Sequence, residues 1–130
     1  DYGAKRVGIA VTDEQRIISS PLDTYDTDKI FDFIDSYIDT NNVDLFLVGL
    51  PTNLKGLETD ATKITTDFIK KLREKYKQVD VETYDERFTS KIARDSLIFL
   101  GKNKKYRRKK SNIDKVSASI ILQSYLQRNS

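Results

Sequence analysis

LFLVGLP, residues 45–51, is the stretch of this sequence that decides its fold. Leu45 to Val48 form a continuous apolar run, and Gly49 to Pro51 end it. A strand with one face in solvent alternates apolar and polar residues, whereas a continuous apolar run is typical of a strand that is buried on both faces. Such strands lie inside parallel sheets, because the connections of a parallel sheet place helices on its faces. The stretch therefore predicts a central parallel strand of an α/β domain.

The segments on either side of this strand have the patterns of helices and of a second parallel strand. Residues 28–39 carry apolar side chains at helical spacing opposite a stripe of aspartates, which predicts an amphipathic helix with a solvated acidic face. A second helix is predicted over Glu58–Tyr76, and Val79–Tyr84 alternates as a strand. The inner side of that helix is expected to carry Ala61, Ile64, Phe68 and Leu72. Helix, strand, helix, strand is the order of a βαβ unit.

An antiparallel hairpin is predicted before this unit. Val7–Val11 places Gly8 and Ala10 on one face, which is typical of a strand with a closely packed side, and Ile17–Pro21 is expected to pair with it. Residues 3–5 resemble a turn, so a further strand, truncated at its N-terminus, is expected to end at Asp1.

Two helices are expected to complete the chain. One begins at Thr89 or Ser90 and stops at Gly101, and the last runs from Asn112 or Ile113 to about Gln127. The last helix is expected to turn its apolar side to the core with Ile113, Val116, Ile120 and Ile121. We predict one domain over residues 1–130, of α/β class, with a mixed five-stranded sheet, the antiparallel hairpin and helices on both faces. No segment approaches the ~18 apolar residues of a membrane span, so no membrane partner is expected.

The composition narrows the chemistry that this chain can perform. Cys and His are absent, which excludes a structural zinc site, a cysteine nucleophile and a Ser-His-Asp triad. Clustered carboxylates remain, and these are hard oxygen ligands suited to Mg²⁺ or Mn²⁺.

Three acidic residues can meet at the carboxyl edge of the predicted sheet, where ligands of open α/β sheets bind. Asp1 would end the first strand, Glu86 follows the strand that ends at Tyr84, and Asp114 lies in the expected first turn of the last helix. Converging carboxylates repel one another unless a cation offsets the charge, and two metal ions about 4 Å apart could support hydrolysis of a phosphodiester. Each acid alone is equally compatible with a structural role, and Asp85 competes with Glu86 for the inward position.

Several basic and polar residues are expected to bind nucleic acid near these acids. Residues 102–110 contain seven Lys or Arg, with Tyr106 between them, which suggests a phosphate-tracking surface. The expected substrate-binding residues are Lys5, Arg6, Asn53, Arg87, Thr89, Ser90, Lys105, Arg107 and Arg108.

Four segments of the chain resemble the motifs of one family. Residues 1–10 (DYGAKRVGIA), 48–53 (VGLPTN) with Gly56, 85–90 (DERFTS) and 113–126 are similar, in this order, to the motifs of the YqgF/RuvX family of Holliday-junction-resolvase-like pre-16S rRNA nucleases. Departures are small: Thr52 stands where the family more often has Leu, and Ser117 and Ser119 replace Ala. The resemblance implies an RNase H-like fold, a Mg²⁺ or Mn²⁺ site held by Asp1, Glu86 and Asp114, and cytoplasmic cleavage of nucleic acid.

Alternatives to cleavage of precursor rRNA remain open at this stage. The protein could resolve branched DNA, which would require a homodimer rather than a monomer for symmetric cuts. It could bind nucleic acid without cutting, or hold a nucleotide as sugar-kinase and actin-like ATPases do, although 130 residues leave no room for their second lobe. Ribosomal precursor particles are expected partners if rRNA is the substrate.

Overall fold

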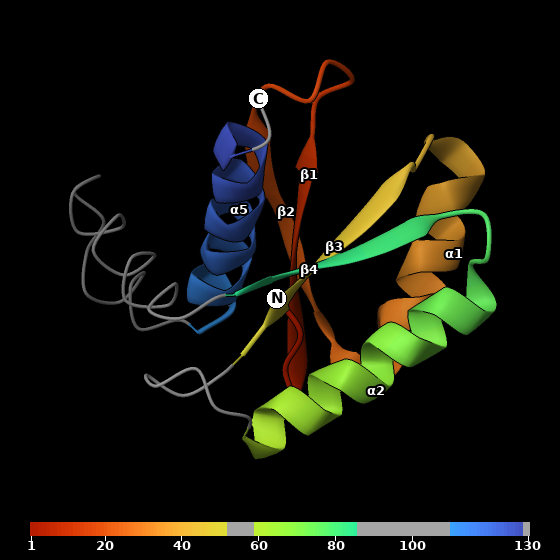
Figure 1. Cartoon of the computed structure of the whole chain (residues 1–130), viewed down its shortest axis with the longest axis vertical. Helices are drawn as coiled ribbons and strands as arrows, with labels where there is room; N and C mark the ends of the chain where they lie inside the picture. Colours follow the sequence, from red (N-terminus) through yellow and green to blue (C-terminus); the bar gives the residue numbers. More distant parts are fainter. Residues whose placement is uncertain (52–58, 86–109, 129–130) are drawn as a thin grey trace.

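The computed structural model describes residues 1–51, 59–85 and 110–128, with the backbone alone for residues 110–112. In chain order the elements are β1 (Arg6–Thr12), β2 (Ser19–Asp26), the short 3-10 helix η1 (Thr27–Lys29), α1 (Ile30–Thr40), β3 (Leu45–Leu50), α2 (Asp60–Lys75), β4 (Asp80–Asp85) and α5 (Lys110–Arg128). Figure 1 shows their arrangement. Within the described ranges, no helix is both long enough and apolar enough to span a bilayer.

β1 and β2 form the predicted antiparallel hairpin, in register from Arg6 opposite Asp26 to Thr12 opposite Ser19. The second strand was expected over Ile17–Pro21 but begins at Ser19 and continues to Asp26. Asp13 explains the later start, because its carboxylate accepts hydrogen bonds from the backbone N–H groups of Ile17 and Ile18 at 2.8 and 2.9 Å. Both isoleucines therefore belong to the turn and are exposed.

β3 and β4 pair in parallel, from Leu45 opposite Asp80 to Leu50 opposite Asp85, and α2 connects them. This confirms the predicted βαβ unit. The expected five-stranded sheet is not seen, because the described residues form two separate two-stranded sheets. A cavity of about 700 Å³ lies between β1 and β3, and Asp1 and Tyr2 border it.

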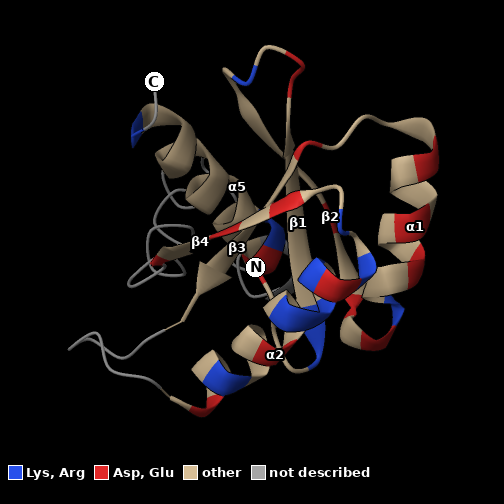
Figure 2. Cartoon of the chain, turned by 45° about the vertical axis from the view of Figure 1, so that its right-hand side comes forward, with Lys and Arg blue, Asp and Glu red and all other residues tan. Residues whose placement is uncertain are grey.

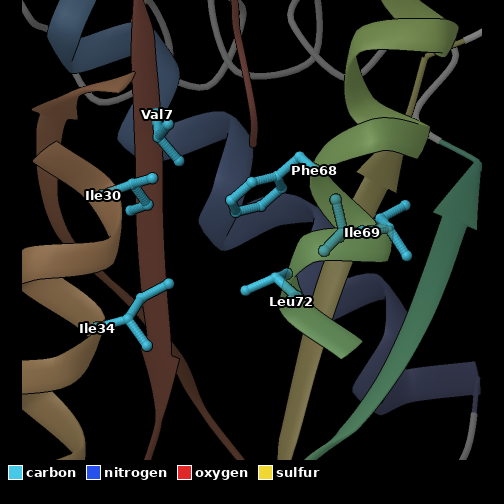
Figure 3. Close-up of a cluster of buried hydrophobic side chains, with 7 residues drawn as sticks. Val7, Ile30, Ile34, Phe68, Ile69 and Leu72 are labelled. Carbon is cyan, nitrogen blue, oxygen red and sulfur yellow. The ribbon is translucent and has the colours of Figure 1, made fainter. Parts of the chain in front are cut away.

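The main core lies between the strands and the two helices α1 and α2. It contains Val7, Ile30, Ile34, Val48, Phe68, Ile69 and Leu72, most of which are labelled in Figure 3. On α1 the predicted division holds, since Ile30 and Ile34 are buried while its aspartates lie on the outer surface (Figure 2).

The buried face of α2 differs from the prediction, and its start lies at Asp60 rather than Glu58. Phe68 and Leu72 are buried as expected, but Ala61 and Ile64 are exposed and Thr62 and Thr65 take their place. Thr62 can be buried because its hydroxyl is satisfied: it donates to the carbonyl of Pro51 and takes part in a capping box with Thr59. Local hydrogen bonds therefore rotate the helix from the face that hydrophobicity alone favours.

α5 covers the opposite face of the hairpin, lying alongside β1 and β2 (Figure 1). Its most buried residues are Ser117, Ala118 and Ile121, so of the four predicted core positions Ile121 alone is fully buried. Small residues face the strands here because the helix backbone approaches β1 closely. The helix begins at Lys110, two or three residues earlier than expected, and Asp114 therefore lies beyond its first turn.

Candidate functional site

Asp1 is fixed against the first strand by its backbone. The N–H of Gly8 donates to the carbonyl of Asp1 at 2.9 Å, and the nitrogen of Asp1 donates to the carbonyl of Gly8 at 2.9 Å. Such an exchange of two hydrogen bonds is the unit of an antiparallel ladder. This pair places Asp1 beside β1.

Tyr2 adds a packing anchor directly after Asp1. Its ring stacks on Phe68 of α2 with ring centroids 4.0 Å apart, and burial raises the pKa of its phenol. The backbone of Asp1 is thus fixed by its hydrogen bonds to β1 and by the packing of the next residue, Tyr2, on α2.

Asp114 reaches the same residue of β1 from the other face of the hairpin. A Cβ atom added to Gly8 would lie 2.2 Å from the carbonyl oxygen of Asp114 and 2.9 Å from the nitrogen of Lys115. Only a residue without a side chain allows the backbone of α5 to approach β1 this closely. Val7, the preceding residue, points to the main core, as the alternation of side chains along a strand requires.

Gly8 is therefore the point at which two of the three predicted acids meet. Asp1 is hydrogen-bonded to its backbone, and the α5 turn that carries Asp114 packs on its open face. These two residues are 113 positions apart in sequence and are brought together by β1. Gly8 was assigned to a closely packed face from the sequence, but its role in seating Asp114 was not foreseen.

The side chain of Asp114 is paired with Arg6, at the start of β1. The Nε of Arg6 donates to Oδ2 of Asp114 at 3.2 Å, and the two side chains are 33% and 17% exposed. Arg6 is predicted from the sequence to bind phosphate, whereas in the structure its guanidinium contacts one of the predicted metal ligands.

The turn between Asp1 and β1 carries Lys5, which is exposed. The turn is held to the start of η1 by Thr27, whose hydroxyl donates to the carbonyl of Gly3 at 2.7 Å and whose N–H donates to the carbonyl of Lys5 at 3.0 Å. Lys5 is thus exposed on a turn that hydrogen bonds hold in place.

The remaining predicted site residues lie outside the described residues. These are Glu86, Asn53, Arg87, Thr89, Ser90, Lys105, Arg107 and Arg108, together with the expected helix from Thr89 or Ser90 to Leu100. Asp85, the alternative to Glu86, is the last residue of β4 and is exposed.

Asp1 and Asp114, the two predicted ligands among the described residues, have side chains that suit a divalent cation. Carboxylate oxygens are the ligands that Mg²⁺ and Mn²⁺ prefer, and the backbones of Asp1 and Asp114 converge on one residue. Among the described residues no three acidic side chains gather at one point, and Glu86 is not among those residues. A complete site therefore needs a ligand beyond Asp1 and Asp114.

Comparison with known proteins gives matches over nearly the whole chain. A family model described as "RuvX: Holliday junction resolvase" matches residues 1–128. A protein of Amoebophilus asiaticus named "Putative pre-16S rRNA nuclease" is 44% identical over 126 residues, which are 97% of this chain and 89% of that protein. Proteins with the same name from Phocaeicola vulgatus and Flavobacterium psychrophilum are 41% and 40% identical, covering 98% of this chain and 91% and 93% of their own lengths.

Proposed function

Because this chain belongs to the RuvX family of Holliday junction resolvases, we propose that it is a metal-dependent nuclease that matures the 5′ end of pre-16S rRNA. The relatives named as pre-16S rRNA nucleases support the choice of substrate, since they match at about 40% identity over nearly their full lengths. The observation that carries the proposal is the meeting of Asp1 and Asp114 at Gly8, because it joins two acids of different motifs.

In this proposal Asp1, Glu86 and Asp114 hold one or two Mg²⁺ or Mn²⁺ ions. Bound in this way, divalent ions lower the pKa of a water and stabilise the leaving oxygen of a phosphodiester. β1 and α5 fix the backbones of Asp1 and Asp114 beside Gly8 before substrate arrives. Lys5, Asn53, Arg87, Thr89 and Ser90 position the phosphate backbone.

The rest of the substrate is bound by cationic side chains. Lys105, Arg107 and Arg108 belong to the basic segment 102–110, which would track phosphates and give binding that weakens steeply with salt. The proposed partners are precursor rRNA and ribosomal precursor particles, in the cytoplasm. A second candidate substrate is branched DNA, which the family's description favours and which would require a homodimer.

We also propose that the chain is one RNase H-like domain with a five-stranded sheet. The fifth strand would occupy the cavity between β1 and β3. Two observations support this: Asp1 and Gly8 already exchange the hydrogen bonds of an antiparallel pair, and residues of both β1 and β3 line the cavity. The amides of Ala10 and Thr12, which share the open edge with Gly8, should then resist hydrogen exchange. Rapid exchange at both would contradict this strand.

A cleavage assay tests the proposed activity and separates the two substrates. One preparation is incubated with precursor 16S rRNA ends and with a four-way DNA junction, with Mg²⁺, Mn²⁺ or Ca²⁺ present. We expect cleavage of the rRNA with Mg²⁺ or Mn²⁺, and a loss of at least about hundredfold in Asp1→Asn, Glu86→Gln and Asp114→Asn. Cutting by all three variants at the parent rate would refute the assignment of the acids, and cutting of the junction alone would replace rRNA by branched DNA.

A further inference from the structure

We propose that Arg6 is a positioning residue that holds Asp114 in the metal-free protein and is displaced by the divalent ion. Once displaced, its guanidinium becomes available to a substrate phosphate. The inference rests on the proposed function, because it requires Asp114 to be a metal ligand. It assigns to one arginine two successive partners, first a carboxylate of its own chain and then the nucleic acid.

The geometry of the ion pair suits a contact that can be exchanged. Arg6 uses Nε alone in its bond to Oδ2 of Asp114, at 3.2 Å. A guanidinium has five N–H donors, so four of them, on the two terminal nitrogens, are not used in this bond. Those nitrogens are the ones that form paired hydrogen bonds with phosphate. The arginine is 33% exposed, so a ligand can approach it from solvent.

The ion pair is not needed to dock α5 on the hairpin, because other contacts do so. The hydroxyl of Ser19 donates to the carbonyl of Ser119 at 2.8 Å, and the N–H of Ser19 donates to the side chain of Gln123 at 3.0 Å. At the other end of the helix, the backbone of Asp114 packs on Gly8. A purely structural role for Arg6 would therefore duplicate contacts that already exist.

Electrostatics makes Arg6 and a metal ion competitors for Asp114. A carboxylate that is 17% exposed and already paired with a cation attracts a second cation less strongly, and the two positive charges repel each other. Removing the guanidinium should therefore strengthen metal binding. The same removal should weaken the binding of nucleic acid to the metal-loaded protein, because a phosphate contact is lost.

Binding of Mn²⁺ alone, followed by electron paramagnetic resonance, tests the competition. We expect Arg6→Gln to bind Mn²⁺ about tenfold more tightly than the parent, a change typical of losing one charge-assisted hydrogen bond. Arg6→Lys, which keeps a cation, should remain near the parent value. Arg16→Gln is the matched control: Arg16 also pairs with an aspartate, Asp44, but lies in the turn at the far end of β1, and its loss should leave Mn²⁺ affinity unchanged.

The outcomes separate this inference from the proposed function. If Arg6→Gln binds Mn²⁺ no more tightly than the parent while Asp114→Asn binds it more weakly, the role of Arg6 is refuted and the metal site stands. If Asp114→Asn binds Mn²⁺ as the parent does, Asp114 is not a ligand and both fall.

A measurement on the unmodified protein covers the case in which Arg6→Gln does not fold. In a nitrogen-15 spectrum, the Nε–H signal of Arg6 should shift on saturation with Mg²⁺, because its hydrogen bond to Asp114 is broken. The Nε–H signal of Arg16, whose ion pair is formed by a terminal nitrogen far from the site, should not move. An Arg6 signal that is unaffected by Mg²⁺ refutes the displacement.

Discussion

Replacing Gly8 by alanine is expected to separate the two acids that meet at this residue. The new Cβ would lie 2.2 Å from the carbonyl oxygen of Asp114, whereas ordinary contacts begin at 3.4 Å. The helix turn must therefore move by about 1.2 Å, because the opposing atoms belong to backbone and cannot rotate away. Overpacking of this kind costs about 3 kcal/mol, which exceeds the gain of about 1 kcal/mol that alanine brings by restricting the unfolded chain.

Two assays measure this effect. The net loss is therefore about 2 kcal/mol, so the midpoint of urea unfolding should fall by about 1 M, for a dependence of about 2 kcal/mol per molar urea. Cleavage should fall by about a hundredfold even where the protein is folded, because a displacement of about 1 Å is enough to misplace a catalytic group. Ser20→Thr, which adds a methyl group to an exposed position of β2, should change neither. A Gly8→Ala protein with the stability and activity of the parent would refute the reasoning.

Three further substitutions test other parts of the structure. Ser117→Ala should raise stability by about 1 kcal/mol and the melting temperature by about 4 °C. The reason is that, within the described residues, the buried Ser117 hydroxyl has no hydrogen-bond partner. Ser119→Ala is the control and should bring no such gain, because the hydroxyl of Ser119 lies within hydrogen-bonding distance of Ser19. Burial, and then the hydrogen bond to Asp35, raise the pKa of Tyr76, so the fold favours the neutral phenol. Its contribution is complete below the usual tyrosine pKa of about 10 and is lost as the pH rises above it, so Tyr76→Phe should unfold with a weaker alkaline dependence than the parent. The N–H groups of Ile18 and Ile17 lower the pKa of Asp13, so its contribution is present above a pH of about 4 and is lost on acidification below it. Asp13→Ala should therefore lose less stability than the parent between about pH 5 and pH 2, and parallel pH profiles of the two proteins would contradict this.

The elements that follow from periodicity were largely predictable from the sequence. The apolar run at 45–48 and the alternation after residue 79 indicated two parallel strands, and β3 and β4 pair in this way. The division of α1 into an apolar and an acidic side also followed, because its aspartates recur at helical spacing. These features depend on the spacing of apolar and polar residues within one segment, and this spacing can be read directly from the sequence.

Features that depend on particular hydrogen bonds or on distant contacts were not predictable. On α2, residues 61 and 64 and residues 62 and 65 both continue the helical spacing of the buried Phe68 and Leu72, and the capping box of Thr62 decides for the second pair. Similarly, Asp13 turns Ile17 and Ile18 outward although both are strongly apolar.

The candidate site combines both kinds of feature. The acids could be selected from the sequence because carboxylates are the ligands that a chain without His or Cys offers to a metal. Their approach to each other could not, since it depends on Gly8 accepting a helix from 106 residues further along the chain. The hydrogen bond between Arg6 and Asp114 joins residues that are 108 positions apart, and no local sequence pattern predicts it.

Anomalous X-ray diffraction from crystals grown with Mn²⁺ gives the most direct test of the shared acid site. We predict a Mn²⁺ peak within coordination distance, about 2.2 Å, of carboxylate oxygens of Asp1, Glu86 and Asp114, with the Arg6 guanidinium turned away from Asp114. A Mn²⁺ ion bound elsewhere, with Asp114 still paired to Arg6 and Glu86 remote from Asp1, would contradict the site.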